Sequence, residues 1–139
     1  MKVPTWLTVY GDTSFRGDCP PEQQEQVTFF NTLRSEFPDT LGLLALHPRN
    51  EGKRDWRQVQ RERVEGMAVG ASDIIIPGCH SFVCELKRRD HTKCRLSKEE
   101  AAYLAAAKDA GAFVCLALGW KAAMEAIAVW KRIGDLRGL

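Results

Sequence analysis

Three residues near the middle of the chain have the types and spacing to do chemistry together: Asp73, Glu85 and Lys87. Hard divalent cations prefer oxygen ligands, and Mg²⁺ is usually held by one or two carboxylates together with water and substrate phosphate. A lysine beside such a site can position water or neutralise charge that develops on a phosphate. The set indicates a metal site for phosphate chemistry. The alternative is that these are ordinary solvated polar residues at the ends of strands.

The residues between these groups predict the hairpin that would bring them together. Ile74–Ile76 and residues 82–87 are rich in β-branched, aromatic and other apolar side chains, and Pro77-Gly78 favours a tight turn between them. Because side chains alternate along a strand, every second residue of 82–87 shares a face. One face of this strand is then wholly apolar, while the other carries Glu85 and Lys87.

The pattern Gly-x-x-Asp, followed by Glu-x-Lys, resembles that of the PD-(D/E)xK nucleases. More closely, the chain is similar to a minimal, stand-alone VRR-NUC domain of the kind found in phage genomes. The similarity covers Glu22-x-x-x-Gln26, residues 47–54, 66–73, 85–88 and 96–100, and the turn at Gly111 with the strand after it. Two positions depart from the pattern, since Ser72 stands where the family usually has proline and Glu100 where it usually has glutamine.

This resemblance implies an α/β fold with the restriction-endonuclease-like core, in which helices flank a central mixed β-sheet, and a single domain over residues 1–139. It also implies a metal-dependent DNA endonuclease. Asp73, Glu85 and the main-chain carbonyl of Leu86 would hold one or two Mg²⁺ or Mn²⁺ ions, and Lys87 would position or activate the attacking water.

The resemblance further implies that Glu22 approaches the metal from the first helix and that Gln26 supports it. Glu25 is the competing candidate, and an acidic first turn that complements the helix dipole is the alternative to a catalytic role. Glu100 matches an auxiliary polar position. Its place in Ser97-x-x-Glu100 already predicts a capping box, which is a sufficient structural role.

Stand-alone domains that resemble this one are often homodimers that act on branched DNA such as four-way (Holliday) junctions. Basic residues suited to backbone contact occur in the loop after His47, in the helix predicted over residues 55–65, and in the loop that follows Lys87. A solvated helix face is the alternative for the middle group. The residues expected to contact DNA are Arg49, Lys53, Arg54, Arg57, Arg61, Arg88, Arg89, Lys93 and Arg95.

The composition is that of an ordinary globular protein, with 45% hydrophobic and 27% charged residues among 139. The formal net charge is only +2, so nucleic-acid binding would depend on local basic surfaces rather than on the total. No stretch is long and apolar enough to span a membrane, and the N-terminus lacks the pattern of a signal peptide. We therefore expect an intracellular, cytoplasmic protein.

The five cysteines are an odd number, which does not suit a closed disulfide framework. Cys79, His80, Cys84, His91 and Cys94 fall near one another and raise the alternative of a small zinc-stabilised interaction protein. Their spacings fit no common zinc module well. A non-catalytic DNA-binding module on the nuclease fold is the second alternative, although a pure binder has no need of paired carboxylates.

Periodicity and turn signals predict the remaining elements. We expect an arm or edge strand over residues 3–10 and a helix from Asp18 to about Glu36 with Val27, Phe30 and Leu33 buried. We also expect a strand over 41–46, a strand over 112–118, and helices over 97–110 and 120–133.

Overall fold

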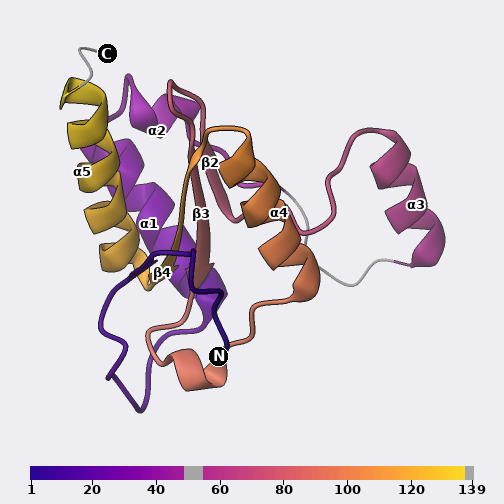
Figure 1. The fold of residues 1–139 in the computed structure, drawn as a ribbon, viewed down its shortest axis with the longest axis horizontal. Coiled ribbons are helices and arrows are strands. Elements are labelled where there is room, and N and C mark those ends of the chain that lie inside the picture. Colours follow the sequence, from indigo (N-terminus) through magenta and orange to yellow (C-terminus); the bar gives the residue numbers. More distant parts are fainter. Residues whose placement is uncertain (49–54, 137–139) are drawn as a thin grey trace.

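The computed structural model describes residues 1–48 and 55–136, the side chains of 135 and 136 excepted, and shows a four-stranded sheet (Figure 1). Its strands lie in the order β1 (Val9–Tyr10), β4 (Phe113–Leu118), β3 (Phe82–Lys87) and β2 (Ile74–Ile76). β4 pairs in parallel with both β1 and β3, whereas β2 and β3 form an antiparallel hairpin. The predicted hairpin and the predicted mixed sheet are therefore both present.

Helices cover both faces of this sheet (Figure 1). α1 (Glu22–Glu36) and α5 (Trp120–Leu136) pack together on one face, and α4 (Lys98–Asp109) lies on the other. Phe82, Cys84 and Leu86 of β3 belong to the core under α1 and α5, whereas Val83 packs beneath α4 with Leu104. The alternation read from the sequence thus directs Glu85 and Lys87 to the α4 side.

The strand predicted over residues 41–46 is wrong, because residues Leu41–Leu44 form the short helix α2. The Gly42 N–H donates to the Phe37 carbonyl at 2.8 Å, so the chain turns back onto the end of α1 instead of extending. A Cβ at Gly42 would lie 2.6 Å from that same oxygen, which requires glycine at this contact. Leu46 alone makes a β-bridge, to Ile75.

Two further expectations need correction. Val27 is 51% exposed, whereas Phe29 is fully buried beside Phe30 and Leu33, so the buried face of α1 is rotated from the one predicted. An arm or edge strand is expected over residues 3–10; an edge strand is present, but it is limited to Val9–Tyr10.

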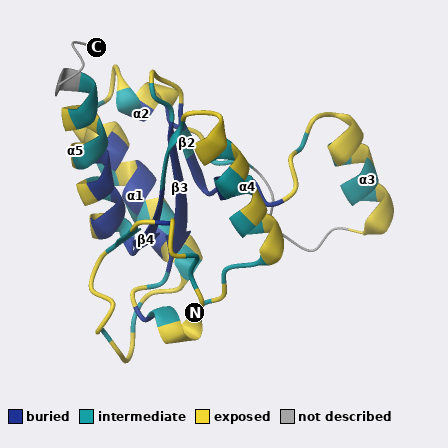
Figure 2. Cartoon of the chain, in the orientation of Figure 1, coloured by how far each residue is buried: buried dark blue, intermediate teal, exposed yellow. Residues whose placement is uncertain are grey.

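α3 (Trp56–Val64) stands apart from the sheet at one side of the molecule (Figure 1). The Asp55 side chain caps its start by accepting from the Gln58 N–H at 2.7 Å, and none of its residues is buried (Figure 2). A short 3₁₀ turn, η1 (His91–Lys93), follows β3. None of the described helices is both long and apolar enough to cross a membrane.

Candidate metal centre

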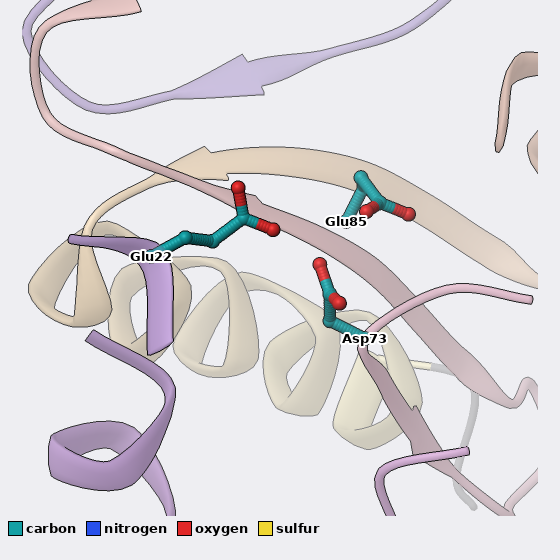
Figure 3. A group of neighbouring side chains, drawn as sticks. All are labelled: Glu22, Asp73 and Glu85. Carbon is teal, nitrogen blue, oxygen red and sulfur yellow. The ribbon is translucent and has the colours of Figure 1, made fainter. Parts of the chain in front are cut away.

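Three carboxylates from three separate elements converge at one end of β3 (Figure 3). Glu22 is the first residue of α1, Asp73 directly precedes β2, and Glu85 lies on β3. One carboxylate oxygen from each lies within 4.8 Å of the others. Such oxygens, close enough to share one ion, fit the ligand preference of Mg²⁺ or Mn²⁺.

The hairpin positions Asp73 against the neighbouring strand. The last paired residues of the hairpin at this end are Ile74 of β2 and Cys84 of β3. Just beyond them, the Asp73 Oδ2 accepts from the Leu86 N–H at 2.9 Å. The Lys87 carbonyl accepts from Gly119 on the β4 side. Successive carbonyls of a strand point to opposite edges, so the Leu86 carbonyl faces the Asp73 side.

Burial makes this group of carboxylates costly without a cation. Asp73 is 5% exposed and Glu85 only 1%. The Glu85 Oε2 is buried and has no hydrogen-bond partner within the described part of the chain. Burial, and then the neighbouring Asp73, raise the pKa of Glu85 far above its ordinary value of 4.5. An unsatisfied buried carboxylate oxygen beside two others is what a divalent cation would satisfy.

Lys87 brings a positive charge to these acids. It is 5% exposed, and its Nζ lies 3.1 Å from the Glu100 Oε2 and 3.8 Å from the Glu85 Oε1. Burial opposes its charged form, but the carboxylates of Glu22, Glu85 and Glu100 outweigh this and raise the pKa of Lys87 above its usual value. The ammonium group is therefore held charged at the edge of the carboxylate cluster.

Glu100 forms the capping box predicted for it and also contacts Lys87. Its Oε1 accepts from the Ser97 N–H at 2.8 Å and the Ser97 hydroxyl accepts from the Glu100 N–H at 3.0 Å, so the predicted capping box is confirmed. The same carboxylate binds the Lys87 ammonium. Burial disfavours its charge, but hydrogen bonds from Glu85 and Ser97, together with Lys87, lower the pKa of Glu100 to about 2.

Glu25, the competing candidate, binds the start of α5 and is not in the group of three carboxylates. The Glu25 Oε2 accepts from the Trp120 N–H at 2.7 Å, so this buried glutamate caps the start of α5. Gln26 lines a different hollow, next to His47. Of the acidic residues at the start of α1, Glu22 is the one that the structure places beside Asp73.

One contact at the centre has no local signal in the sequence. The ring of His47, which we considered only as part of a basic loop, lies with Nδ1 2.8 Å from the main-chain oxygen of Asp73. It therefore supports the segment that carries this carboxylate. Only the folded chain brings the two residues together, because 26 positions separate them.

The carboxylates line a hollow of about 430 Å³ that is open to solvent on one side. Val59 of α3 and Val69 form part of its wall, so the projecting helix borders the candidate site. Gly70 has φ +74°, and a Cβ there would lie 2.4 Å from the main chain of Glu99. This glycine lets the segment before Asp73 approach the start of α4.

The structure divides the basic residues predicted to contact DNA into three groups. Arg49, Lys53 and Arg54 lie outside the described residues. Arg57 and Arg61 are exposed on α3, and Arg95 is exposed after η1. Arg88, Arg89 and Lys93 contact the segment before α1 in the same chain. Some of the charged groups expected to bind DNA are therefore engaged in contacts within the protein.

The cysteines and histidines of residues 79–94 do not converge. Cys84 is fully buried in the core, His80 Nδ1 lies 2.7 Å from the Gly111 carbonyl oxygen, and His91 Nε2 lies 3.1 Å from that of Thr13. Within the described ranges, Glu22, Asp73 and Glu85 are the group close enough to hold an ion. The geometry therefore gives the zinc alternative no site.

No family profile matches this sequence, and neither does any curated protein. A solved structure described as a "VRR_NUC domain protein" superposes with a TM-score of 0.62 at 15% sequence identity, over 80% of this chain and 88% of that one. At this identity the likeness is one of fold. It confirms that the chain has the VRR_NUC fold which the sequence pattern predicted.

Proposed function

We propose that residues 1–139 form one nuclease domain that hydrolyses phosphodiester bonds of DNA with Mg²⁺ or Mn²⁺. The observation that carries this proposal is the convergence of Glu22, Asp73 and Glu85, with Lys87 beside them, on a VRR_NUC fold. A hollow lined with carboxylates repels phosphate unless a cation neutralises it. A phosphodiester substrate and a divalent ion therefore explain the site together.

The three carboxylates and the Leu86 carbonyl would hold the ion. When bound, such an ion polarises the scissile phosphate, lowers the pKa of a nearby water and stabilises the leaving oxygen. The protein's own contribution comes from Lys87, whose ammonium group can orient the attacking water or neutralise charge that grows on the phosphate. Glu100 restrains that ammonium group through its contact of 3.1 Å.

Branched DNA, including four-way junctions, is the substrate class that we propose, and a homodimer is the form that would act on it. Two sites related by a two-fold axis match the symmetry of such a junction. Arg57 and Arg61 lie on a helix that borders the hollow through Val59, which suits contact with a duplex arm that leaves the site. We place this activity inside a cell, in the host cytoplasm if the protein is phage-encoded.

The test compares wild type with Lys87→Met, which keeps the length of the buried stem and removes the charge. Lys108→Met, at the exposed end of α4, is the matched control. Labelled four-way junction, flap, single-stranded and duplex DNA would each be incubated with Mg²⁺, Mn²⁺ or EDTA. We expect cleavage with either metal, a preference for branched DNA, and a loss of about 100-fold or more in rate for Lys87→Met.

Two outcomes would contradict the proposal. If wild type cuts none of these substrates yet binds them, the protein is a DNA-binding module on a nuclease fold. If wild type and Lys87→Met cut equally well, hydrolysis takes place without the lysine, and the assignment of the site is wrong. Analytical ultracentrifugation of the same samples tests the homodimer.

A further inference from the structure

The segment between β1 and α1, residues 11–21, contains no helix or strand and is largely exposed, yet it leads directly into Glu22, the first residue of α1. It runs beside the turn at residues 88–93 that directly follows β3 (Figure 1). Pro21 is the N-cap of α1, and its side chain makes no capping hydrogen bond. Contacts that hold this segment therefore also restrain the backbone that leads into Glu22.

Contacts from the turn hold the segment along its length. The Arg88 Nη2 donates to the Cys19 carbonyl at 2.9 Å, and its Nε donates to the Pro20 carbonyl at 3.2 Å. Further back, the Gly17 N–H donates to the buried Asp90 at 2.9 Å, and Lys93 donates to the Gly17 carbonyl at 3.0 Å. The two carbonyls bound by Arg88 lie nearest to Glu22 in the sequence.

We propose that Arg88 is a positioning residue for the metal centre, one that fixes Glu22 against Asp73 and Glu85. A guanidinium group presents its donors in a rigid plane, so bonds to two consecutive carbonyls fix both the place and the direction of the chain that enters α1. Arg88 itself follows directly on β3, whose six residues are all buried. The strand that carries Glu85 therefore also sets the distance to Glu22.

This role differs from the DNA contact that the sequence suggested for Arg88. Two of its donor atoms, Nε and Nη2, are already bound to main-chain oxygens, and its side chain is half-buried. Arg95, in the same stretch of chain, is exposed. Arg95 thus offers a matched control whose charge is available to DNA.

The inference rests on the proposed metal site, so its test measures metal binding directly and without DNA. Mn²⁺ binding would be measured by electron paramagnetic resonance and calorimetry for wild type, Arg88→Gln, Arg88→Lys, Arg95→Gln, Glu22→Gln and the double variant Arg88→Gln/Glu22→Gln. Hydrogen exchange of residues 13–24 would report whether the segment loosens, and circular dichroism would report whether each variant folds. DNA binding would be measured separately in EDTA.

We expect Arg88→Gln to weaken Mn²⁺ binding by about tenfold or more, as removal of a residue that orients a metal ligand commonly does. Arg88→Lys should recover only part of this loss, because a single ammonium group cannot bind both carbonyls in a fixed plane. The double variant should bind Mn²⁺ no more weakly than Glu22→Gln alone, since both changes act through the same carboxylate. Exchange should rise at residues 13–24, and DNA binding in EDTA should fall for Arg95→Gln but not for Arg88→Gln.

Several results would overturn the inference. One is unchanged Mn²⁺ affinity in a folded Arg88→Gln protein, and another is a double variant whose loss is the sum of the single losses. If Arg88→Gln does not fold, wild-type Mn²⁺ affinity in Arg88→Lys would overturn the inference instead. Wild type that binds no Mn²⁺ would overturn the proposed metal site and this inference together, whereas normal wild-type binding with an unaffected Arg88→Gln would overturn the inference alone.

Discussion

Replacing Glu85 with glutamine should stabilise the metal-free protein at neutral pH while removing its response to metal. Glu85 is 1% exposed, and burial next to Asp73 raises its pKa far above the ordinary value of 4.5. At pH 7 the folded protein therefore keeps this proton, whereas the unfolded chain loses it. Because the folded state binds more protons, the free energy of unfolding falls as pH rises.

The size of the effect follows from the pH interval. Each pH unit above the unfolded pKa costs about 1.4 kcal/mol for one such group, so the interval from 4.5 to pH 7 costs up to about 3 kcal/mol. Glutamine cannot ionise and has nearly the same shape. The difference in unfolding free energy between Glu85→Gln and wild type should therefore grow by about 3 kcal/mol between about pH 5 and pH 7.5.

The assay is urea unfolding in EDTA at several pH values, repeated with saturating Mn²⁺. Glu36→Gln, at the exposed end of α1, is the matched control and should leave the profile close to wild type. With Mn²⁺ at about 100 times its dissociation constant, wild type should gain about 2.7 kcal/mol and Glu85→Gln should gain little. If the metal-free curves of the two proteins run parallel across this pH range, Glu85 is ionised in the folded protein and the reasoning from burial is refuted.

Two further predictions concern the residues that support the site. Gly70→Ala should cost at least about 2 kcal/mol in urea unfolding, because it adds a close contact with the main chain of Glu99 to the strain of a positive φ. Gly66→Ala, with a positive φ and nothing within 4 Å of the added Cβ, isolates the strain alone, and an equal loss in the two variants would contradict the close-contact argument. Glu25→Ala should cost about 1 to 2 kcal/mol, because it leaves the partly buried Trp120 N–H without its acceptor. Gln24→Ala, at an exposed position of the same helix, should cost little. Equal losses in the two variants would argue against the cap.

The core of the site could be predicted because its geometry is local. Alternation along β3 separates Glu85 and Lys87 from the apolar face, and the short connection over residues 77–81 brings Asp73 back beside β3. The Ser97–Glu100 capping box could be predicted for the same reason, since its partners are three residues apart. Short-range periodicity and turn chemistry contain this information in full.

The remaining parts depend on contacts between distant segments. Glu22 and Glu25 both lie in the first turn of α1. Which of them faces the carboxylates depends on the packing of α5: Glu25 binds the Trp120 N–H at the start of α5, and Glu22 lies beside Asp73. The apolar run at 41–46 suggests a strand until Gly42 docks on the end of α1. Arg88 has the sequence signature of a nucleic-acid contact, and nothing near it in the chain indicates that it binds residues 68 and 69 positions earlier.

The alternation on β3 also has a consequence for folding. β3 pairs in register with β4, Glu85 beside Leu116 and Lys87 beside Leu118. If the pairing slipped by one residue, both charged groups would enter the apolar layer under α1 and α5, while Leu86 would move to the carboxylate side. An unpaired buried charge costs several kcal/mol, so the mispaired sheet would be strongly disfavoured. The residues proposed for hydrolysis would thus also select the correct strand pairing as the protein folds.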